Sequence, residues 1–122
     1  MKYLAMTLFT AGLAFAQATP VLTKDLAGVP GKEVVMLTLD VAPGAASNAH
    51  RHNANTFVYV LEGQMVMQVK GGKEVTIGPG ETFYESPEDV HSVSKNASPT
   101  KPAKILVFFV KEKGAPQTVP AK

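Results

Sequence analysis

Short segments rich in β-branched and aromatic residues, separated by Gly, Pro and Asn, most constrain what this chain can fold into. Val, Ile, Phe, Tyr and Thr favour extended strands, whereas Gly, Pro and Asn end strands in turns. No segment carries a convincing helical periodicity. The pattern predicts an all-β sandwich or barrel, with strands at 33–41, 56–62, 64–70, 73–77, 81–85, 91–94 and 104–111.

A length of 122 residues fits one packed domain and is too short for two. We expect that domain to occupy residues 20–113. The last residues, 114–122, include Pro116 and Pro120, and we expect an extended tail there, lying across a neighbouring chain or mobile.

The first residues have the layout of a secretory signal peptide. Lys2 precedes a mostly apolar stretch, 3–15, and the triplet Ala14-Phe15-Ala16 has the small-x-small pattern of a cleavage site. The apolar stretch is too short for a membrane span of ~20 residues. We therefore read residues 1–16 as a signal peptide and expect an exported protein, periplasmic or secreted, that starts near Gln17.

Charge and composition exclude several classes of function. The formal net charge is +2 and falls to +1 when Lys2 is removed with the signal peptide, so charge does not recruit nucleic acid. The chain has no cysteine, which excludes disulfides, thiolate metal sites and a cysteine nucleophile. We expect no nucleic-acid partner and no membrane association.

The three histidines of the chain, His50, His52 and His91, have the spacing of a metal site. Side chains at i and i+2 of a strand point to the same side, about 6.6 Å apart. Neutral imidazole is the commonest protein ligand for divalent transition metals. With His91 on another strand, the three can hold one divalent transition metal and leave positions for water or substrate. Three imidazoles do not select among Zn, Cu, Fe, Mn and Ni.

The glycines and histidines together resemble the motifs of the cupin superfamily. The first motif, G-x5-H-x-H-x3,4-E-x6-G, matches from Gly44 through His50 and His52 to Gly63, with Thr56 at the glutamate position. The second motif, G-x5-P-x-G-x2-H-x3-N, is matched more loosely by Gly80, Pro87, Asp89, His91 and Asn96.

Within the superfamily, the chain looks like the small single-domain type, the cupin type 2 conserved barrel. This resemblance implies a double-stranded β-helix, a jelly-roll barrel whose mouth holds a metal. If Thr56 takes the glutamate position, Val58 and Val60 share its inward face, and Phe57, Tyr59 and Leu61 face outward.

Replacing the family glutamate by Thr56 leaves the remaining ligands open. Either water completes the coordination sphere of a metal held by three histidines, or another side chain supplies the oxygen ligand. Tyr84 is a candidate hydrogen-bond donor to a bound oxygen, and the alternative is that it only packs in the core. Arg51 should point away from the metal by alternation. The other candidates for an additional ligand or a neighbouring position are Asn53, Asn55, Thr56 and Glu85.

Two segments, 57–61 and 105–110, are apolar on both faces. A strand with one wet face does not show this pattern, so the outer side should also be covered. Either a second copy of the chain or loops of the same chain could cover this side. We expect a second copy, that is, a homodimer.

Two functions fit the predicted site, and no catalytic residue is identifiable from the sequence. The first is a metal-dependent enzyme, an oxidoreductase or dioxygenase, isomerase or lyase, acting on a small oxygen-bearing molecule. The alternative is a non-catalytic module that binds a metal or small molecule as a sensor or carrier.

Overall fold

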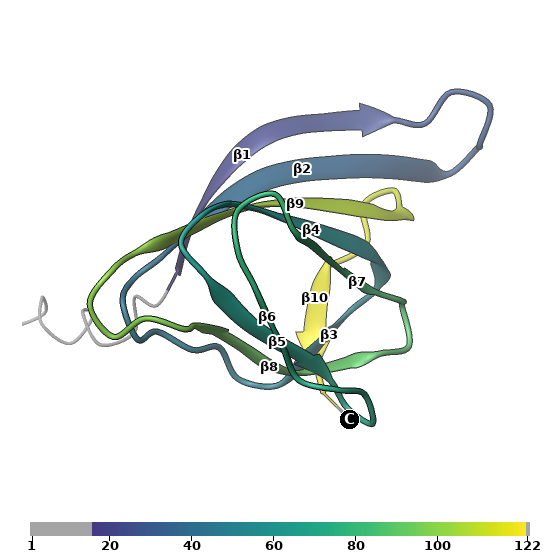
Figure 1. Cartoon of the computed structure of the whole chain (residues 1–122). Helices are drawn as coiled ribbons and strands as arrows, with labels where there is room; N and C mark the ends of the chain where they lie inside the picture. The colour runs from purple at the N-terminus through teal and green to yellow at the C-terminus, as the bar shows by residue number, and fades with distance from the viewer. Residues whose placement is uncertain (1–15, 122) are drawn as a thin grey trace, which may run out of the picture.

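The computed structural model describes residues 16–121 and consists there of strands and turns, with no helix (Figure 1). Within this range no helix could cross a membrane. The strands are β1 (Ala16–Asp25), β2 (Lys32–Val41), β3 (His50–His52), β4 (Ala54–Glu62), β5 (Met65–Val69), β6 (Val75–Ile77), β7 (Thr82–Glu85), β8 (Val90–Asn96), β9 (Ala103–Glu112) and β10 (Thr118–Pro120).

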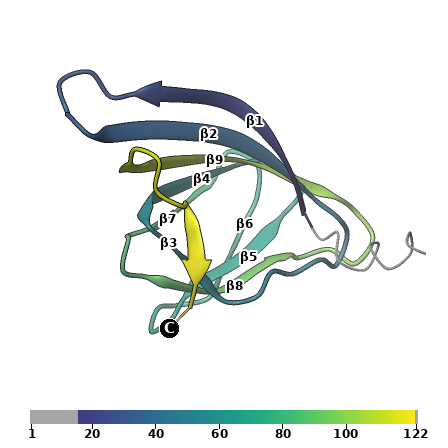
Figure 2. The same ribbon diagram turned by 180° about the vertical axis from the view of Figure 1, so that it is seen from behind.

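The strands form two antiparallel five-stranded sheets that enclose the core between them (Figures 1 and 2). One sheet has the order β1-β2-β9-β4-β7, and the other has the order β10-β3-β8-β5-β6. Neighbours such as β2 and β9 are far apart in sequence, as in a jelly roll, rather than joined by successive hairpins. The predicted all-β double-stranded β-helix is therefore confirmed.

Alternation along the strands builds the core. On β4, Thr56, Val58 and Val60 are buried, while Phe57 and Tyr59 are exposed, as the sequence predicted. The facing sheet contributes Met65 and Met67, the largest apolar side chains that are fully buried. On β9 the inward residues are Ala103, Ile105, Val107 and Phe109.

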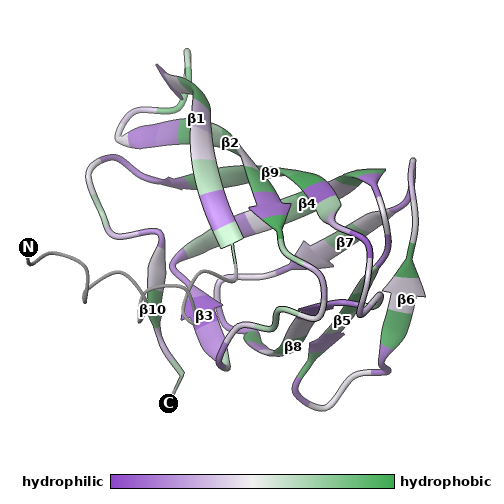
Figure 3. Cartoon of the chain, turned by 90° about the vertical axis from the view of Figure 1, so that its left-hand side faces the viewer, coloured by the Kyte–Doolittle hydropathy of each residue, from purple (hydrophilic) through white to green (hydrophobic). Residues whose placement is uncertain are grey.

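The outer face of the first sheet is apolar as well. Phe57, Tyr59 and Leu61 of β4 and Tyr84 of β7 are the exposed large side chains there, and Leu106 and Phe108 of β9 are half-buried beside them. Hydrophobic colour covers parts of β9 and β4 in Figure 3. Within residues 16–121, no further layer covers this face.

Two backbone sites hold the barrel loops in place. Gly63 adopts φ 80°, and a Cβ at this position would lie 2.6 Å from the carbonyl oxygen of Pro102. Asn96, the asparagine of the second motif, is buried, and its side-chain amide donates to the carbonyls of Val41 and Lys101. Both positions of the family motifs are therefore structural.

The two ends of the chain differ from the prediction. β1 begins at Ala16, four residues before the expected start of the domain, and pairs with β2 through Asp25. The tail is not loose, because β10 pairs with β3 of the same chain. The predicted signal peptide, 1–16, lies outside the described residues except for Ala16.

Candidate metal centre

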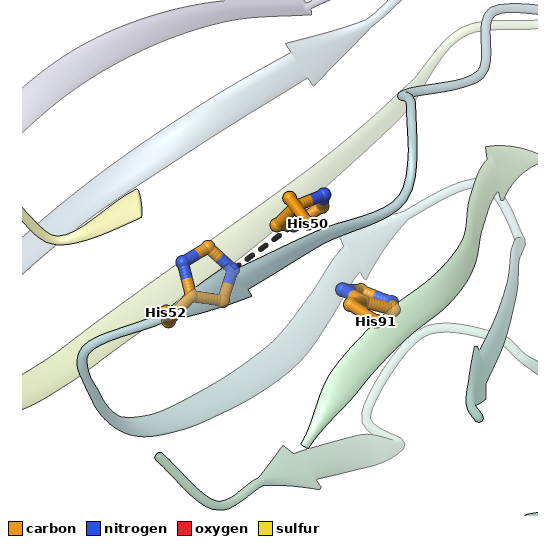
Figure 4. A group of neighbouring side chains, drawn as sticks. All are labelled: His50, His52 and His91. Carbon is orange, nitrogen blue, oxygen red and sulfur yellow. Dashed lines mark hydrogen bonds between the residues drawn. The ribbon is translucent and has the colours of Figure 1, made fainter. Parts of the chain in front are cut away.

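The three histidines come together as predicted, at one end of the cavity between the sheets. His50 and His52 point to the same side of β3, and His91 of β8 is the direct cross-strand partner of His50 (Figure 4). One nitrogen from each ring lies within 4.8 Å of the others. Two nitrogens about 2.1 Å from one metal are at most about 4.2 Å apart, so a small ring rotation closes the site.

Main-chain carbonyls set which nitrogens face the site. His50 Nδ1 lies 2.7 Å from the Asn48 carbonyl, and His52 Nδ1 lies 2.9 Å from the Gln117 carbonyl. A carbonyl accepts only, so each Nδ1 carries the proton and each Nε2 presents a lone pair. The two Nε2 atoms are 3.1 Å apart. A shared cation satisfies both lone pairs at this separation, because two nitrogens bound to one metal at right angles are about 3.0 Å apart.

Glu85 supplies a carboxylate to the same place from the opposite sheet. Its Oε2 lies 2.8 Å from His91 Nδ1 and 3.9 Å from His52 Nε2. Glu85 of β7 is the cross-strand partner of Thr56 of β4, and both are 1% exposed. The carboxylate therefore reaches the site from the strand next to the position where the family motif has its glutamate.

The buried polar atoms of Glu85 and His91 lack hydrogen bonds. Although Oε2 is close to His91 Nδ1, the contact does not have hydrogen-bond geometry, and neither carboxylate oxygen nor either ring nitrogen has a partner. Such unpaired groups are costly in a protein interior, and an ion is a recognised way to satisfy them. The residues present therefore fit a divalent metal. Three imidazoles and one carboxylate suit zinc, copper, nickel, iron and manganese alike.

Burial keeps His52 in the form that can bind a metal. Loss of solvent lowers the pKa of His52 below its usual value, while the Glu85 carboxylate and the Gln117 carbonyl act in the opposite direction. The net effect favours neutral imidazole at neutral pH, which is the ligating form. The ring also packs against Phe109, with centroids 5.0 Å apart, which restricts its rotation.

Beneath the histidines is a cavity of about 290 Å³. Its floor and walls are mostly apolar and include Leu37, Val58, Met67 and Val107. Ala18 of β1, Gln117 and Thr118 of β10 also line the cavity. A ligand in this cavity would meet polar groups at the histidines and mostly apolar side chains elsewhere.

Of the additional candidates, the structure brings only Thr56 and Glu85 into the site. Asn55 and Tyr84 are on the outer face of their strands, where the Tyr84 hydroxyl donates to Asn55 Oδ1. They do not line the cavity, because each has the opposite parity to Thr56 and Glu85. Asn53 is exposed and does not line the cavity. Arg51 points away, as predicted, and its guanidinium donates to the Pro87 carbonyl.

The sequence reasoning missed the contribution of the C-terminal segment. The Gln117 carbonyl and the Thr118 hydroxyl, 3.1 Å from His52 Nδ1, both meet the ring from β10. A main-chain carbonyl leaves no mark in a sequence. Only the pairing of β10 with β3 reveals it.

Comparison with known proteins identifies the family. A family model described as the cupin domain matches residues 37–109, more than half of the chain. The chain belongs to the cupin family. No match was found among curated proteins.

Solved structures share the fold at low sequence identity. The DMSP lyase DddQ from Ruegeria pomeroyi is 15% identical, with a TM-score of 0.72 over 99% of this chain and 59% of its own. A protein with a double-stranded β-helix domain from Klebsiella pneumoniae is 20% identical, with a TM-score of 0.65 over 89% and 87%. Oxalate oxidase in complex with the substrate analogue glycolate is 25% identical, with a TM-score of 0.61 over 88% and 55%. The chain spans little more than half the length of the two enzymes.

Proposed function

We propose that this chain is a metal-dependent cupin enzyme that binds one divalent transition metal and acts on a small oxygen-bearing molecule. His50, His52, His91 and Glu85 would hold the metal. One observation carries the proposal: unpartnered polar atoms of a buried carboxylate and a buried imidazole meet two lone pairs at the mouth of a cavity.

A bound metal would supply Lewis-acid polarisation of a ligand oxygen. A few groups of the chain would orient the metal ligands, exclude water and accept a proton. The carbonyls of Asn48 and Gln117 orient two rings, and the apolar walls exclude water. Glu85 is the one carboxylate lining the cavity among the described residues, so it is the carboxylate able to accept a ligand proton. An oxidoreductase or dioxygenase, an isomerase or a lyase would all use these functions.

The fold neighbours support the range of reactions without choosing among them. They include proteins described as a lyase, an oxidase and a polyketide cyclase. The alternative is a non-catalytic sensor or carrier. It is favoured by the lack of a second acid or base besides the histidines and Glu85 among the described residues that line the cavity.

The first test is the metal content of protein purified without added metal. We expect about one equivalent in the wild type and a loss in His52→Ala, with Ser47→Ala, a cavity residue that is not a ligand, as the matched control. Wild type without metal, even after incubation with each of the five ions, would contradict the proposal. The metal-loaded protein is then assayed on diketones, flavonols, catechols, hydroxy acids and sugars. Turnover supports the enzyme, and tight binding without turnover supports the alternative.

We further propose that the protein is exported, periplasmic or secreted. Cleavage before Gln17 would remove Ala16 and leave the rest of β1 paired with β2. Mass spectrometry of the mature N-terminus tests this proposal, and an intact Met1 would contradict it.

We also propose a homodimer that packs through the apolar outer face. The four exposed side chains Phe57, Tyr59, Leu61 and Tyr84 are each 42–48% exposed. The surface area of a large side chain of this kind is about 150–250 Å². At these exposed fractions, the four together expose on the order of 400 Å² of apolar surface. The half-buried neighbours on β9 extend the patch toward the about 800 Å² per partner of a standard interface.

Two ion pairs lie on the same sheet as the patch: Lys104 pairs with Asp40 at 3.8 Å, and Lys32 pairs with Glu112 at 2.8 Å. Light scattering tests the dimer: Tyr59→Lys should give a monomer, whereas Val29→Lys, equally apolar and exposed but in the β1–β2 turn, should not. A monomeric wild type would refute the interface.

A further inference from the structure

The charges that line the cavity restrict its ligand. Among the described residues around the cavity there is no Lys, no Arg and no Asp, and Glu85 is the one carboxylate. The titratable side chains that line the cavity are the three histidines and Glu85. No cationic side chain is available to pair with a second anionic group of a ligand at the other end.

The charge of the metal-binding end favours one anionic oxygen group. A divalent metal together with the Glu85 carboxylate has a formal charge of +1, because the three imidazoles are neutral when they ligate. One singly charged carboxylate, phenolate or enolate neutralises this end. A second anion would leave a net negative charge in an apolar cavity, which is costly when it is unpaired.

The remaining walls favour a hydrocarbon body of limited size. Away from the histidines, the walls are formed by side chains such as Val58, Met65 and Ile105, which offer no hydrogen bond. Of the two serines nearby, Ser47 already donates to the Ser94 carbonyl. A volume of 290 Å³ holds about ten water-sized groups at ~30 Å³ each. A polyhydroxylated ligand would leave its hydroxyls unpaired here.

We infer that the ligand of this cavity is a small molecule with a single anionic oxygen head, bound at the histidine end, and an apolar body of up to about ten non-hydrogen atoms. This inference rests on the proposed metal-dependent function and names its substrate class. Sugar phosphates, dicarboxylates and polyols are disfavoured by the same contacts.

The test compares acids that differ in one feature at a time, by calorimetry on zinc-loaded protein. Hexanoate and adipate have the same number of carbons, and adipate adds one carboxylate at the deep end. We expect hexanoate to bind at least tenfold more tightly than adipate. From butanoate to hexanoate, affinity should rise about fourfold per methylene, which corresponds to the usual 0.8 kcal/mol per buried CH₂. Equal or tighter binding of adipate, or no gain with chain length, would overturn the inference.

A variant pair tests the charge argument itself. Ser47→Arg places a cation at the cavity wall and should reduce the preference for hexanoate over adipate. Ser47→Gln, similar in length but uncharged, should preserve it. If both variants keep the wild-type preference, the missing cation is not what excludes the second carboxylate.

The zinc content of the protein shows separately whether the proposed metal centre exists. Zinc content is measured on the same samples before titration. A preparation that holds no zinc would refute the proposed metal centre by itself. Zinc-loaded protein that shows no preference for hexanoate overturns the inference alone, whereas zinc-free protein removes the +1 charge on which the inference rests.

Discussion

Removal of β10 should weaken metal binding without unfolding the protein. Residue 117 and β10 contribute two groups to His52 Nδ1, the Gln117 carbonyl at 2.9 Å and the Thr118 hydroxyl at 3.1 Å. The same carbonyl accepts from the amide of Asn53 at 3.3 Å. The residues of β10 are exposed or half-buried, and none belongs to the hydrophobic core.

The expected magnitude follows from these contacts. Each neutral hydrogen bond contributes a net free energy of about 1 kcal/mol. Deleting residues 117–122 removes the hydrogen bond of His52 Nδ1 and that of the Asn53 amide, about 2 kcal/mol of positioning around His52. Loss of a group that orients a metal-bound histidine typically lowers metal affinity by about 10–100-fold. The two estimates agree, because a tenfold change corresponds to about 1.4 kcal/mol.

Competition with a chromogenic chelator measures zinc affinity directly. The matched control ends at Pro120, which keeps β10 and removes only Ala121 and Lys122. Thr118→Val, which keeps the carbonyl, should lose less than the deletion. Spectra of the copper(II) form report whether the nitrogen ligands change. If the protein lacking 117–122 remains folded and binds zinc within twofold of the full chain, the positioning role of β10 is wrong.

Three further predictions concern the inner face and one tight turn. Glu85→Gln should have effects of opposite sign: unfolding of the metal-free protein should cost about 1 kcal/mol more, because a buried unpaired charge is removed, while zinc affinity should fall at least tenfold. Thermal melts with and without zinc measure both, and weaker metal-free stability would contradict the argument. Thr56 and Glu85 are cross-strand partners, so a glutamate at either position should reach the site. The double variant Thr56→Glu, Glu85→Thr should therefore bind zinc at least tenfold more tightly than Glu85→Thr alone. Gly63→Ala should lower the free energy of unfolding by about 3 kcal/mol, against about 1 kcal/mol for Gly28→Ala, since both have positive φ but only Gly63 meets neighbouring backbone. Equal denaturation midpoints for the two glycine variants would show that the close contact at Gly63 is relieved cheaply.

Local alternation explains what the sequence could predict. Period-two patterning is a property of neighbouring residues, and it placed His50 and His52 on one side and Thr56, Val58 and Val60 on one face. The family motif then identified that face as the interior. The motif spacing then brought His91 to the same end. These inferences need no knowledge of which strands pair.

Long-range register explains what the sequence could not predict. Glu85 joins the site because β7 pairs with β4 so that residue 85 lies opposite residue 56, a relation that no local pattern encodes. The same pairing sends Asn55 and Tyr84 outward. β10 has three residues and ends in a proline, too short for any periodicity, and β1 is exposed at every position, so it lacks the inward-outward contrast that marks a strand.

The distribution of ligands over both sheets indicates how the metal relates to stability. His50, His52 and His91 belong to one sheet and Glu85 to the other, so an ion bound by all four connects the two layers of the barrel. The chain has no cysteine and therefore no disulfide to do this. Since the unfolded chain has no assembled site, the free energy of metal binding adds to the free energy of unfolding. The unpaired carboxylate of Glu85 would destabilise the fold without a metal and stabilise the fold with a metal bound. A protein that carried this metal as cargo would spend part of its time in the destabilised form, which favours a resident cofactor over a transported ion.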